Sequence, residues 1–595
     1  MLGACSKPPE PFDIREELGI GLDPHSFFGQ LASGRSRVFR DEDFAPCYAE
    51  EVGRPSIAPS QLALMTLLQH YTCCSDEEAV DKSAFDLRWC AVLGKRAGEP
   101  LCAKSTFQGF RDRLMANEGV RVLFVASIKE AKRAGLLKRG AALGVSLDTK
   151  PMLGRGAVKD TYNLLATGIV KLVEAMAATA GQRAEEWARA NDFGRYFGSS
   201  LKGSAGIEWS DAKARQAFLN EVVVDVERLQ RLAGERLAGE GLEGGARKRI
   251  AEAAMLLEAL LLQDVVEMTD AEGQVQAELR KGTAADRIPS ATDQDQRHGH
   301  KSKSKVFTGH KLAVAVDNES GIIVDAQVLA GNAGDAEGAL EQVERVEENS
   351  GEKVAETTGD CAYGGGETRQ AFADAGRDLA AKVPQEAPNK GRYTKSQFSI
   401  DLSRNCVGCP GGKTTTEFQP GKNGGKVFRF GAQCDGCQLR GECTQAAGGR
   451  TIQVHPQEAM RAAARAYQET AEGRARLQGR VAVEHALARL GHLGVGQARY
   501  VGRTKSLFQV LLAATIANLR RTWNWERQQG GNGEATGANL GLAGWLRLVG
   551  GLLRATIAGW LGADGPRAPK EGSELPPLSH GGGERPPAGT FRPAF

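Results

Sequence analysis

Hydrophobic positions in residues 1–138 recur three and four places apart, which is the spacing of short amphipathic helices. Capping residues and glycines bound three such stretches. They fit a small DNA-binding helical domain, in which Arg111 and Arg113 of the third helix would contact DNA. Periodicity alone favours an ordinary helical bundle. The three stretches are Ser60–Tyr71, Ser75–Gly94 and Ser105–Gly119.

Strand-like runs begin after residue 138. Short apolar runs between turn residues predict buried strands, and the polar turn Asp317–Gly321 makes two of them a hairpin. A long segment rich in Ala, Leu, Glu and Arg, at about 160–285, has helical spacing and indicates a helical insertion. The strands are expected at Ala141–Thr149, His310–Asp317, Gly321–Asn332, Lys353–Asp360 and Asp378–Pro384, with a helix after the third and another after the fourth.

The C-terminal part of the chain changes character twice. A Gly-rich stretch with five clustered cysteines indicates an irregular insertion, and helical spacing then returns until the chain becomes rich in Gly and Pro. The sequence therefore predicts a helical N-terminal DNA-binding domain at 1–138, an α/β core at 139–400 that contains the helical insertion, a Cys-rich insertion at 401–455, a helical completion of the core at 456–526, and a largely disordered tail at 527–595.

Charge is unevenly distributed along the chain although its total is small. The net charge is +3, with 25% charged and 41% hydrophobic residues, which is an ordinary globular composition. Two long runs contain basic residues and no acid: Arg297–Val316 and His485–Trp525. A solvated basic face explains either run alone, but two runs in one chain make a polyanionic partner an equal alternative.

Neither export nor membrane insertion is expected. The opening MLGACS resembles a lipoprotein cleavage box, but no basic start and no apolar run precede Cys5. Arg547 and Arg554 interrupt the apolar stretch Leu540–Gly562, which argues against a membrane span. Seven of the twelve cysteines are scattered along the chain, so we expect a reduced, cytoplasmic protein.

Three acids stand where a metal site for phosphodiester chemistry would need them. Asp148 ends the first predicted strand, and Asp360 ends the fourth in the stretch ETTGDCAYGGGET. Strand, hairpin, helix, strand, helix is the order of an RNase H-like sheet, which places two carboxylates side by side as two-metal sites require. Glu484, with Arg480 one turn before it, is the candidate third carboxylate. Taken singly, each acid is explained as a polar turn or an exposed helical residue.

Together these pieces resemble the DDE-type transposases of bacterial insertion sequences, in particular those with a helical InsH-like N-terminal domain and an RNase H-like catalytic domain. The resemblance covers roughly residues 35–525. It is carried by RPSIAPSQLALMTLLQHYTCCSDEEAVDKSAFDLRWCAVLG near the N-terminus, VSLDTKPMLGRGAVKDTYNLL around Asp148, KSKVFTGHKLAVAVD and VLAGNAGDAEGA in the middle, TTGDCAYGGGETRQAF around Asp360, and RVAVEHALARLGHLGVGQARYVGRTKSLFQVLLAATIANLRR around Glu484.

The resemblance implies an enzyme with a mixed α/β fold. Asp148, Asp360 and Glu484 would bind two Mg²⁺ ions, for which Mn²⁺ can substitute. They would cut double-stranded DNA at the element's terminal inverted repeats and join the freed 3′-hydroxyl to target DNA. The glycines after Asp360 would keep bulk away from the DNA backbone. We expect a nucleoid-associated bacterial protein that acts as a homodimer or a larger assembly on DNA.

The family's signature around the third acid, Y-x2-R-x3-E-x6-K, is only partly present. Arg480 and Glu484 match it, whereas Leu477 replaces the Tyr and Gly491 replaces the Lys. The assignment of Glu484 stands, but the accessory phosphate contacts of the two replaced positions are not supported.

Basic side chains near the acids are candidate phosphate contacts. The segment HGHKSKSKVFTGHK is either a solvated strand entry or a segment that holds phosphates, and its histidines are expected at the surface or on phosphates instead of on a metal. The candidates are Lys301, Lys303 and Lys305 in this segment and Arg480, Arg499, Arg503 and Lys505 around Glu484.

The clustered cysteines form two C-x2-C pairs, Cys406 with Cys409 and Cys434 with Cys437. Two such pairs can wrap a structural Zn²⁺ ion in four thiolates. Cys443 would lie beside this site or substitute for one ligand. Reduced thiols in a flexible insertion are the alternative.

Two other functions stay open beside the enzyme. A catalytically silent DNA-binding protein derived from a transposase would not need the acids, and the presence of all three favours the enzyme. A free RNase H-like nuclease would not need the helical N-terminal domain or the basic C-terminal helix, which favour binding to specific DNA ends.

Overall fold

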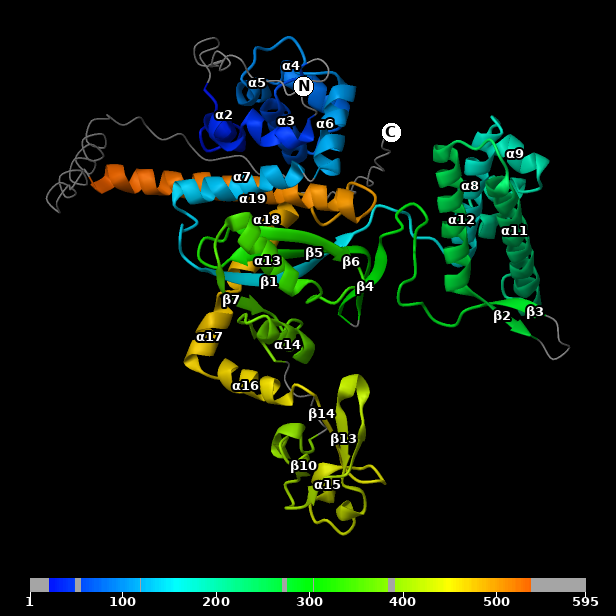
Figure 1. Ribbon diagram of the computed structural model, residues 1–595, viewed down its shortest axis with the longest axis vertical. Coiled ribbons are helices and arrows are strands. Elements are labelled where there is room, and N and C mark those ends of the chain that lie inside the picture. The colour runs from blue at the N-terminus through cyan, green and yellow to red at the C-terminus, as the bar shows by residue number, and fades with distance from the viewer. Residues whose placement is uncertain are drawn as a thin grey trace, which may run out of the picture. The chain divides into compact units, whose positions relative to one another are not determined.

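The computed structural model describes residues 21–48, 55–117, 119–269, 275–302, 304–383 and 391–536 (Figure 1). Helices and a mixed sheet build this part of the chain, which confirms the predicted α/β class. The stretch 540–562 and the tail beyond 536 lie outside the described residues. No single described helix is long and apolar enough to cross a membrane; one bent pair, Thr161–Thr179 with Ala184–Ala190, meets the length and composition test together.

Helices make up the N-terminal segment. Ser75 caps α4 through a capping box with Glu78, and Asp86 ends α4 and caps α5, so the single helix expected at 75–94 is two helices. The helices are α2 (Phe27–Val38), α3 (Pro59–Thr72), α4 (Asp76–Phe85), α5 (Leu87–Leu93), α6 (Lys104–Ala116) and α7 (Gly119–Ala134).

A six-stranded sheet follows in the chain. β1 (Leu143–Leu153) pairs antiparallel with β5 (Lys305–Asp317) and parallel with β7 (Val354–Gly359). β5 also pairs with β6 (Ile323–Ala330) and with β4 (Arg297–Ser302), and β7 pairs with the short β8 (Ala380–Ala381). The strand order is β4, β5, β1, β7, β8, with β6 also paired to β5, and β4 is an additional strand that the sequence analysis did not predict.

One continuous hydrophobic core joins the N-terminal helices to the sheet. It includes Leu62 of α3, Val145 of β1 and Leu511 of α19 (Arg503–Thr536), all of which are buried. The side-chain amide of Asn518 in α19 accepts from the N–H of Ile323 and donates to its carbonyl, so α19 is tied directly to a strand. Removing the N-terminal helices would therefore expose apolar surface of the sheet.

The helical insertion between β1 and β4 has a hydrophobic core of its own. Helical spacing predicts a helix as far as Leu279, but α12 ends at Asp264 and a hairpin of β2 and β3 follows. Asp264 accepts hydrogen bonds from Arg287 and Thr161, which fix the end of the helix, and the β-branched Val265 and Val266 favour extended backbone. The elements are α8 (Thr161–Thr179), α9 (Ala184–Ala190), α10 (Leu201–Ser204), α11 (Ala212–Ala238), α12 (Gly244–Asp264), β2 (Val265–Thr269) and β3 (Val275–Leu279).

The rest of the chain alternates helices of the core with the Cys-rich segment. Short strands of this segment enclose a small core around Val407 and Phe428. The remaining elements are α13 (Ala339–Ser350), α14 (Gly366–Asp374), β9 (Ser399–Asp401), β10 (Cys406–Gly408), β11 (Thr414–Thr415), β12 (Phe418–Pro420), β13 (Lys426–Arg429), α15 (Arg440–Cys443), β14 (Thr451–Val454), α16 (Glu458–Gln468), α17 (Ala471–Gln478) and α18 (Val481–His492).

Candidate active site

Asp148 lies in the middle of β1, opposite Val314 of β5. The strand forms there because Val145 and Leu147 are wholly buried, while the side chain of Asp148 is 18% exposed. Its Oδ1 accepts a hydrogen bond of 2.7 Å from the N–H of Thr149. Its Oδ2 lies 3.3 Å from the guanidinium of Arg480.

Asp360 follows the last residue of β7, the neighbour of β1, as the sequence predicts. Its Oδ1 accepts a hydrogen bond of 2.8 Å from the N–H of Ala362, which shapes the turn. The glycines of this turn serve the protein's own packing: a Cβ on Gly364 would lie 2.1 Å from the carbonyl oxygen of Lys382. A Cβ on Gly366 would lie 2.6 Å from the ring of His455. The expectation that these glycines make room for DNA is therefore wrong for these two positions.

Glu484 is exposed in the first turn of α18. The helix packs on β1 and β5 through an apolar face that includes Val483, Leu487 and Leu490. Its buried face fixes the exposed Glu484 relative to the strands, because residues of a helix have defined directions.

The carboxyl group of Asp148 is influenced by both other acids. Burial is the largest influence and raises its pKa; the Thr149 N–H and the Arg480 guanidinium oppose this, and the negative charges of Asp360 and Glu484 add to it. The net result is a pKa above the usual range for Asp. The charges of Asp360 and Glu484 therefore act on Asp148, although the three acids are far apart in the sequence.

The donor set fits a hard divalent cation, since carboxylate oxygens are the ligands that Mg²⁺ prefers. No three His, Cys, Asp or Glu side chains in the described residues are arranged as a formed metal site. At Asp148, one carboxylate oxygen faces the Arg480 guanidinium and the other accepts from the backbone N–H of Thr149. Arg480 thus places a positive charge beside the Asp148 carboxylate, a group that a metal ion would need as a ligand.

Tyr363 is a part of this site that sequence reasoning missed. Its side chain is 1% exposed, and its hydroxyl has no hydrogen-bond partner among the described residues. Burial raises its pKa first, and the charges of Asp148, Asp335 and Asp360 raise it further. The sequence signal for Tyr363 was its position three residues after Asp360. Its phenol borders the same acidic cluster.

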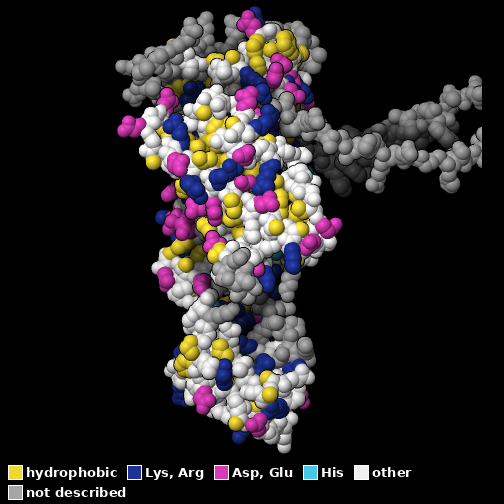
Figure 2. Space-filling view, turned by 90° about the vertical axis from the view of Figure 1, so that its right-hand side faces the viewer, with side chains coloured by type: hydrophobic (Ala, Val, Ile, Leu, Met, Phe, Trp, Pro, Cys, Tyr) yellow, Lys and Arg dark blue, Asp and Glu magenta, His cyan; other side chains and the backbone are white. Residues whose placement is uncertain are grey.

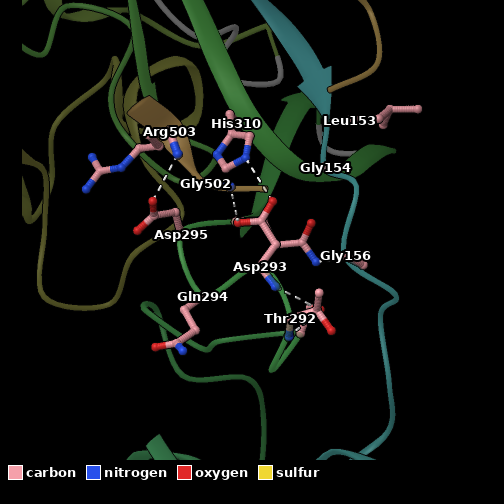
Figure 3. Close-up of polar contacts among 12 residues, drawn as sticks. Leu153, Gly154, Gly156, Thr292, Asp293, Gln294, Asp295, His310, Gly502 and Arg503 are labelled. Atoms are coloured by element: carbon pink, nitrogen blue, oxygen red, sulfur yellow. Dashed lines mark hydrogen bonds and ion pairs between the residues drawn. The ribbon is translucent and has the colours of Figure 1, made fainter. Parts of the chain in front are cut away.

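His310 overturns the expectation that the histidines of the basic segment lie at the surface. Its side chain and that of Asp293 are both fully buried, with Nε2 and Oδ2 3.4 Å apart (Figure 3). The other oxygen of Asp293 accepts from the N–H of Gly502 at 3.3 Å. Burial alone would raise the pKa of Asp293, but the bonds from His310, Gly502 and the Asp295 N–H outweigh it and hold that pKa below its usual range.

This buried pair connects the two basic runs of the sequence. Asp295, two residues after Asp293, accepts a hydrogen bond of 2.9 Å from the N–H of Arg503 at the start of α19 (Figure 3). Arg503 and Lys505 are exposed in that first turn. The segment from Asp293 leads directly into β4, and Lys301 and Lys305 of the β4–β5 hairpin are also exposed; Lys303 lies outside the described residues.

The other predicted phosphate contact beside Glu484, Arg499, has a structural role. Its guanidinium donates to the carbonyl oxygen of Cys74 at 3.3 Å, and its charge lowers the pKa of the buried His70 after burial itself. It therefore joins the C-terminal part of the core to α3 instead of facing solvent. On the face shown in Figure 2, Lys and Arg are interspersed with Asp and Glu, so no broad basic surface covers that side.

The N-terminal arginines are not placed to read DNA bases. The guanidinium of Arg111 makes two hydrogen bonds, of 2.5 and 2.6 Å, with the carboxylate of Asp76, and its side chain is 13% exposed. Arg113 stacks on the ring of Tyr48 at 4.9 Å. The predicted groove contacts of Arg111 and Arg113 are wrong for this arrangement, because both side chains are used in packing within the helical segment.

The cysteines gather in a set different from the predicted one. Cys409, Cys434, Cys437 and Cys443 line one cavity of about 20 Å³. The sulfur atoms of Cys409 and Cys437 both lie within 3.7 Å of the point where a Cβ on Gly411 would stand. Burial, and then the charges of the other three thiols, raise the pKa of Cys443, with Arg450 opposing. Cys406, on β10, does not line this cavity, and its assignment as a ligand stays a prediction.

Comparison with known proteins gives two matches to family models. The Transposase domain (DUF772) matches residues 33–113, the N-terminal helical segment. The Transposase DDE domain matches residues 408–523, which include Glu484 and the four cysteines of the cavity but begin after Cys406. No curated protein and no solved structure matches the chain. Both matched models are transposase domains, and together they support the identification of the chain as a DDE-type insertion-sequence transposase.

Proposed function

We propose that this transposase cuts and joins DNA strands at Asp148, Asp360 and Glu484, with these carboxylates as ligands of Mg²⁺ or Mn²⁺. The observation that carries the proposal is the placement of the three acids: Asp148 lies on β1, Asp360 directly follows the neighbouring β7, and Glu484 lies on α18, which packs on β1. Carboxylates that repel one another at one site are stabilised by a divalent cation. A merely structural site would keep them apart.

Each residue has a separate part in this proposal. Magnesium, when bound, polarises the phosphodiester and activates the attacking hydroxyl. Asp148 and Asp360 stand on adjacent strands of a rigid sheet, and Glu484 stands on a helix packed against it, so the three ligands are held in position before DNA arrives. Arg480 pairs with Asp148 in the free protein, and its guanidinium would also pair with a phosphate of bound DNA.

The β4–β5 hairpin and the start of α19 form the DNA-binding surface in this proposal. Lys301, Lys305, Arg503 and Lys505 are exposed, and the Asp293 segment ties the two elements together. These contacts would hold double-stranded DNA without reading its sequence.

The cysteine cavity supports a structural role for Zn²⁺, bound by Cys409, Cys434, Cys437 and Cys443. A cavity of about 20 Å³ has room for a single ion and is lined by four thiols. The Cys-rich segment encloses few buried apolar side chains, and segments with so small a core commonly depend on a metal or disulfides.

A strand-cleavage assay tests the proposed function. The substrate is a supercoiled plasmid that carries the DNA found on both sides of the gene, with Mg²⁺ present. We expect the wild-type protein to nick it and Asp360→Asn to bind the DNA but leave it intact. Asp374→Asn is the matched control, since Asp374 lies on α14 and contacts only Gln370 in the described structure. Equal cleavage by wild type and Asp360→Asn would overturn the proposal, and DNA binding without any wild-type cleavage would favour the catalytically silent protein.

A further inference from the structure

Lys150 lies on the same face of β1 as Asp148, because side chains two residues apart on a strand point the same way. That face meets α18. The Nζ atom of Lys150 donates to the carbonyl oxygen of Leu487 at 3.4 Å. It also lies 2.8 Å from the point where a Cβ on Gly491 would stand. The ammonium group is therefore lodged against α18, two turns beyond Glu484 on the same helical face.

The charge of Lys150 is not neutralised by the described part of the chain. None of the described Asp or Glu side chains forms an ion pair with Lys150, and among the described residues its ammonium donates only to the Leu487 carbonyl. A half-buried ammonium held by one long hydrogen bond keeps donors available for an anion. The neighbouring carboxylate Asp148 is already paired with Arg480, which leaves Lys150 as a second cation beside the acids.

We propose that Lys150 binds a phosphate of the DNA backbone next to the three acids. The inference rests on the proposed function and identifies one of its substrate contacts. It also accounts for the glycine at position 491, where the family signature has a lysine: the strand supplies the cation, and Gly491 leaves space for its ammonium. A side chain at 491 and Lys150 in its present position would compete for the same space.

DNA binding measured in EDTA tests this inference without metal or catalysis. The probe is a labelled duplex copied from the DNA beside the gene, titrated at several salt concentrations. Lys150→Ala should bind about tenfold more weakly at low salt, and the slope of log affinity against log salt should fall by about one. Lys150→Arg should retain both the wild-type affinity and the wild-type salt slope. Lys353→Ala is the matched control, since this exposed lysine at the start of β7 pairs with Glu347 and should behave as wild type.

The double variant Lys150→Ala with Gly491→Lys gives the sharpest outcome. The new lysine would reach the emptied space from the helix, so affinity and salt slope should return toward the wild-type values. If the wild type binds and cleaves DNA and Lys150→Ala binds it equally well, only the proposed role of Lys150 is overturned. Weakened binding that neither Lys150→Arg nor the double variant restores would also overturn it, because a general folding defect explains that result. A wild type that neither binds nor cleaves would instead refute the proposed function.

Discussion

Replacing Asp293 with Ala should loosen the start of α19. In the wild type, Asp293 is fully buried and accepts from His310 and from the N–H of Gly502. Alanine leaves the buried His310 and the partly buried N–H of Gly502 without this partner, and each lost partner costs roughly 1–3 kcal/mol. The two losses together amount to about 3 kcal/mol, or a factor of about a hundred in the local opening equilibrium.

Hydrogen exchange followed by mass spectrometry measures this loss locally. Peptides that contain Gly502 to Ser506 should exchange about a hundredfold faster in Asp293→Ala at pH 7, while peptides from the N-terminal helices should be unchanged. Asp286→Ala is the control, since this exposed Asp bonds only Asn332 in the described structure. Equal exchange of the α19 peptides in wild type and Asp293→Ala would refute the view that the buried pair anchors this helix.

The pH dependence of the anchor follows from the lowered pKa of Asp293. A carboxyl group whose pKa is lower in the folded state stabilises the fold above its unfolded pKa, and this stabilisation is lost as the pH falls through the folded pKa. The difference in exchange between wild type and Asp293→Ala should therefore be constant at neutral pH and shrink in acid, below about pH 4.

Three further predictions concern other residues. Cys443→Ser should reduce the zinc content of the purified, reduced protein, whereas Cys406→Ser should keep it; the opposite result would restore the predicted ligand set. Arg111→Ala should cost about 2 kcal/mol of stability at pH 7. This cost should shrink from about pH 4 downward as Asp76, whose pKa is lowered to about 2, is protonated. Unchanged stability, with a change only in the protein's preference for element ends over other DNA, would contradict this prediction. Asp148→Asn should raise the melting temperature of the metal-free protein at neutral pH. The reason is that a carboxyl group with a raised pKa destabilises the fold once the pH rises through that pKa. An unchanged or lower melting temperature at pH 7 would contradict this prediction.

The sheet and its acids could be predicted because local signals and topology agree. Apolar runs mark β1, β5 and β6, and they place Asp148 on the first strand, although that strand continues to Leu153 beyond the predicted end; Asp360 directly follows β7. Parallel pairing of β1 with β7 then brings these two positions together. The extra strand β4 was missed, since its basic and polar sequence has no apolar alternation.

The side-chain partners could not be predicted from the sequence. Arg111 appeared to be free for DNA until the fold placed Asp76, 35 residues away, against it. The spacing of two C-x2-C pairs is satisfied by Cys406, yet the cavity of the Cys-rich segment is lined by Cys443 and not by Cys406. Such choices depend on distant segments of chain, which local patterns do not encode.

The central claim is that Asp148, Asp360 and Glu484 hold one metal centre. Iron(II) with ascorbate and peroxide, in place of Mg²⁺, generates radicals at the metal and cuts the chain beside it. We predict backbone cuts near residues 148, 360 and 484, all suppressed by excess Mg²⁺ and all lost in Asp360→Asn. Cuts at only one of the three segments, or cuts that excess Mg²⁺ and Asp360→Asn leave unchanged, would contradict the account.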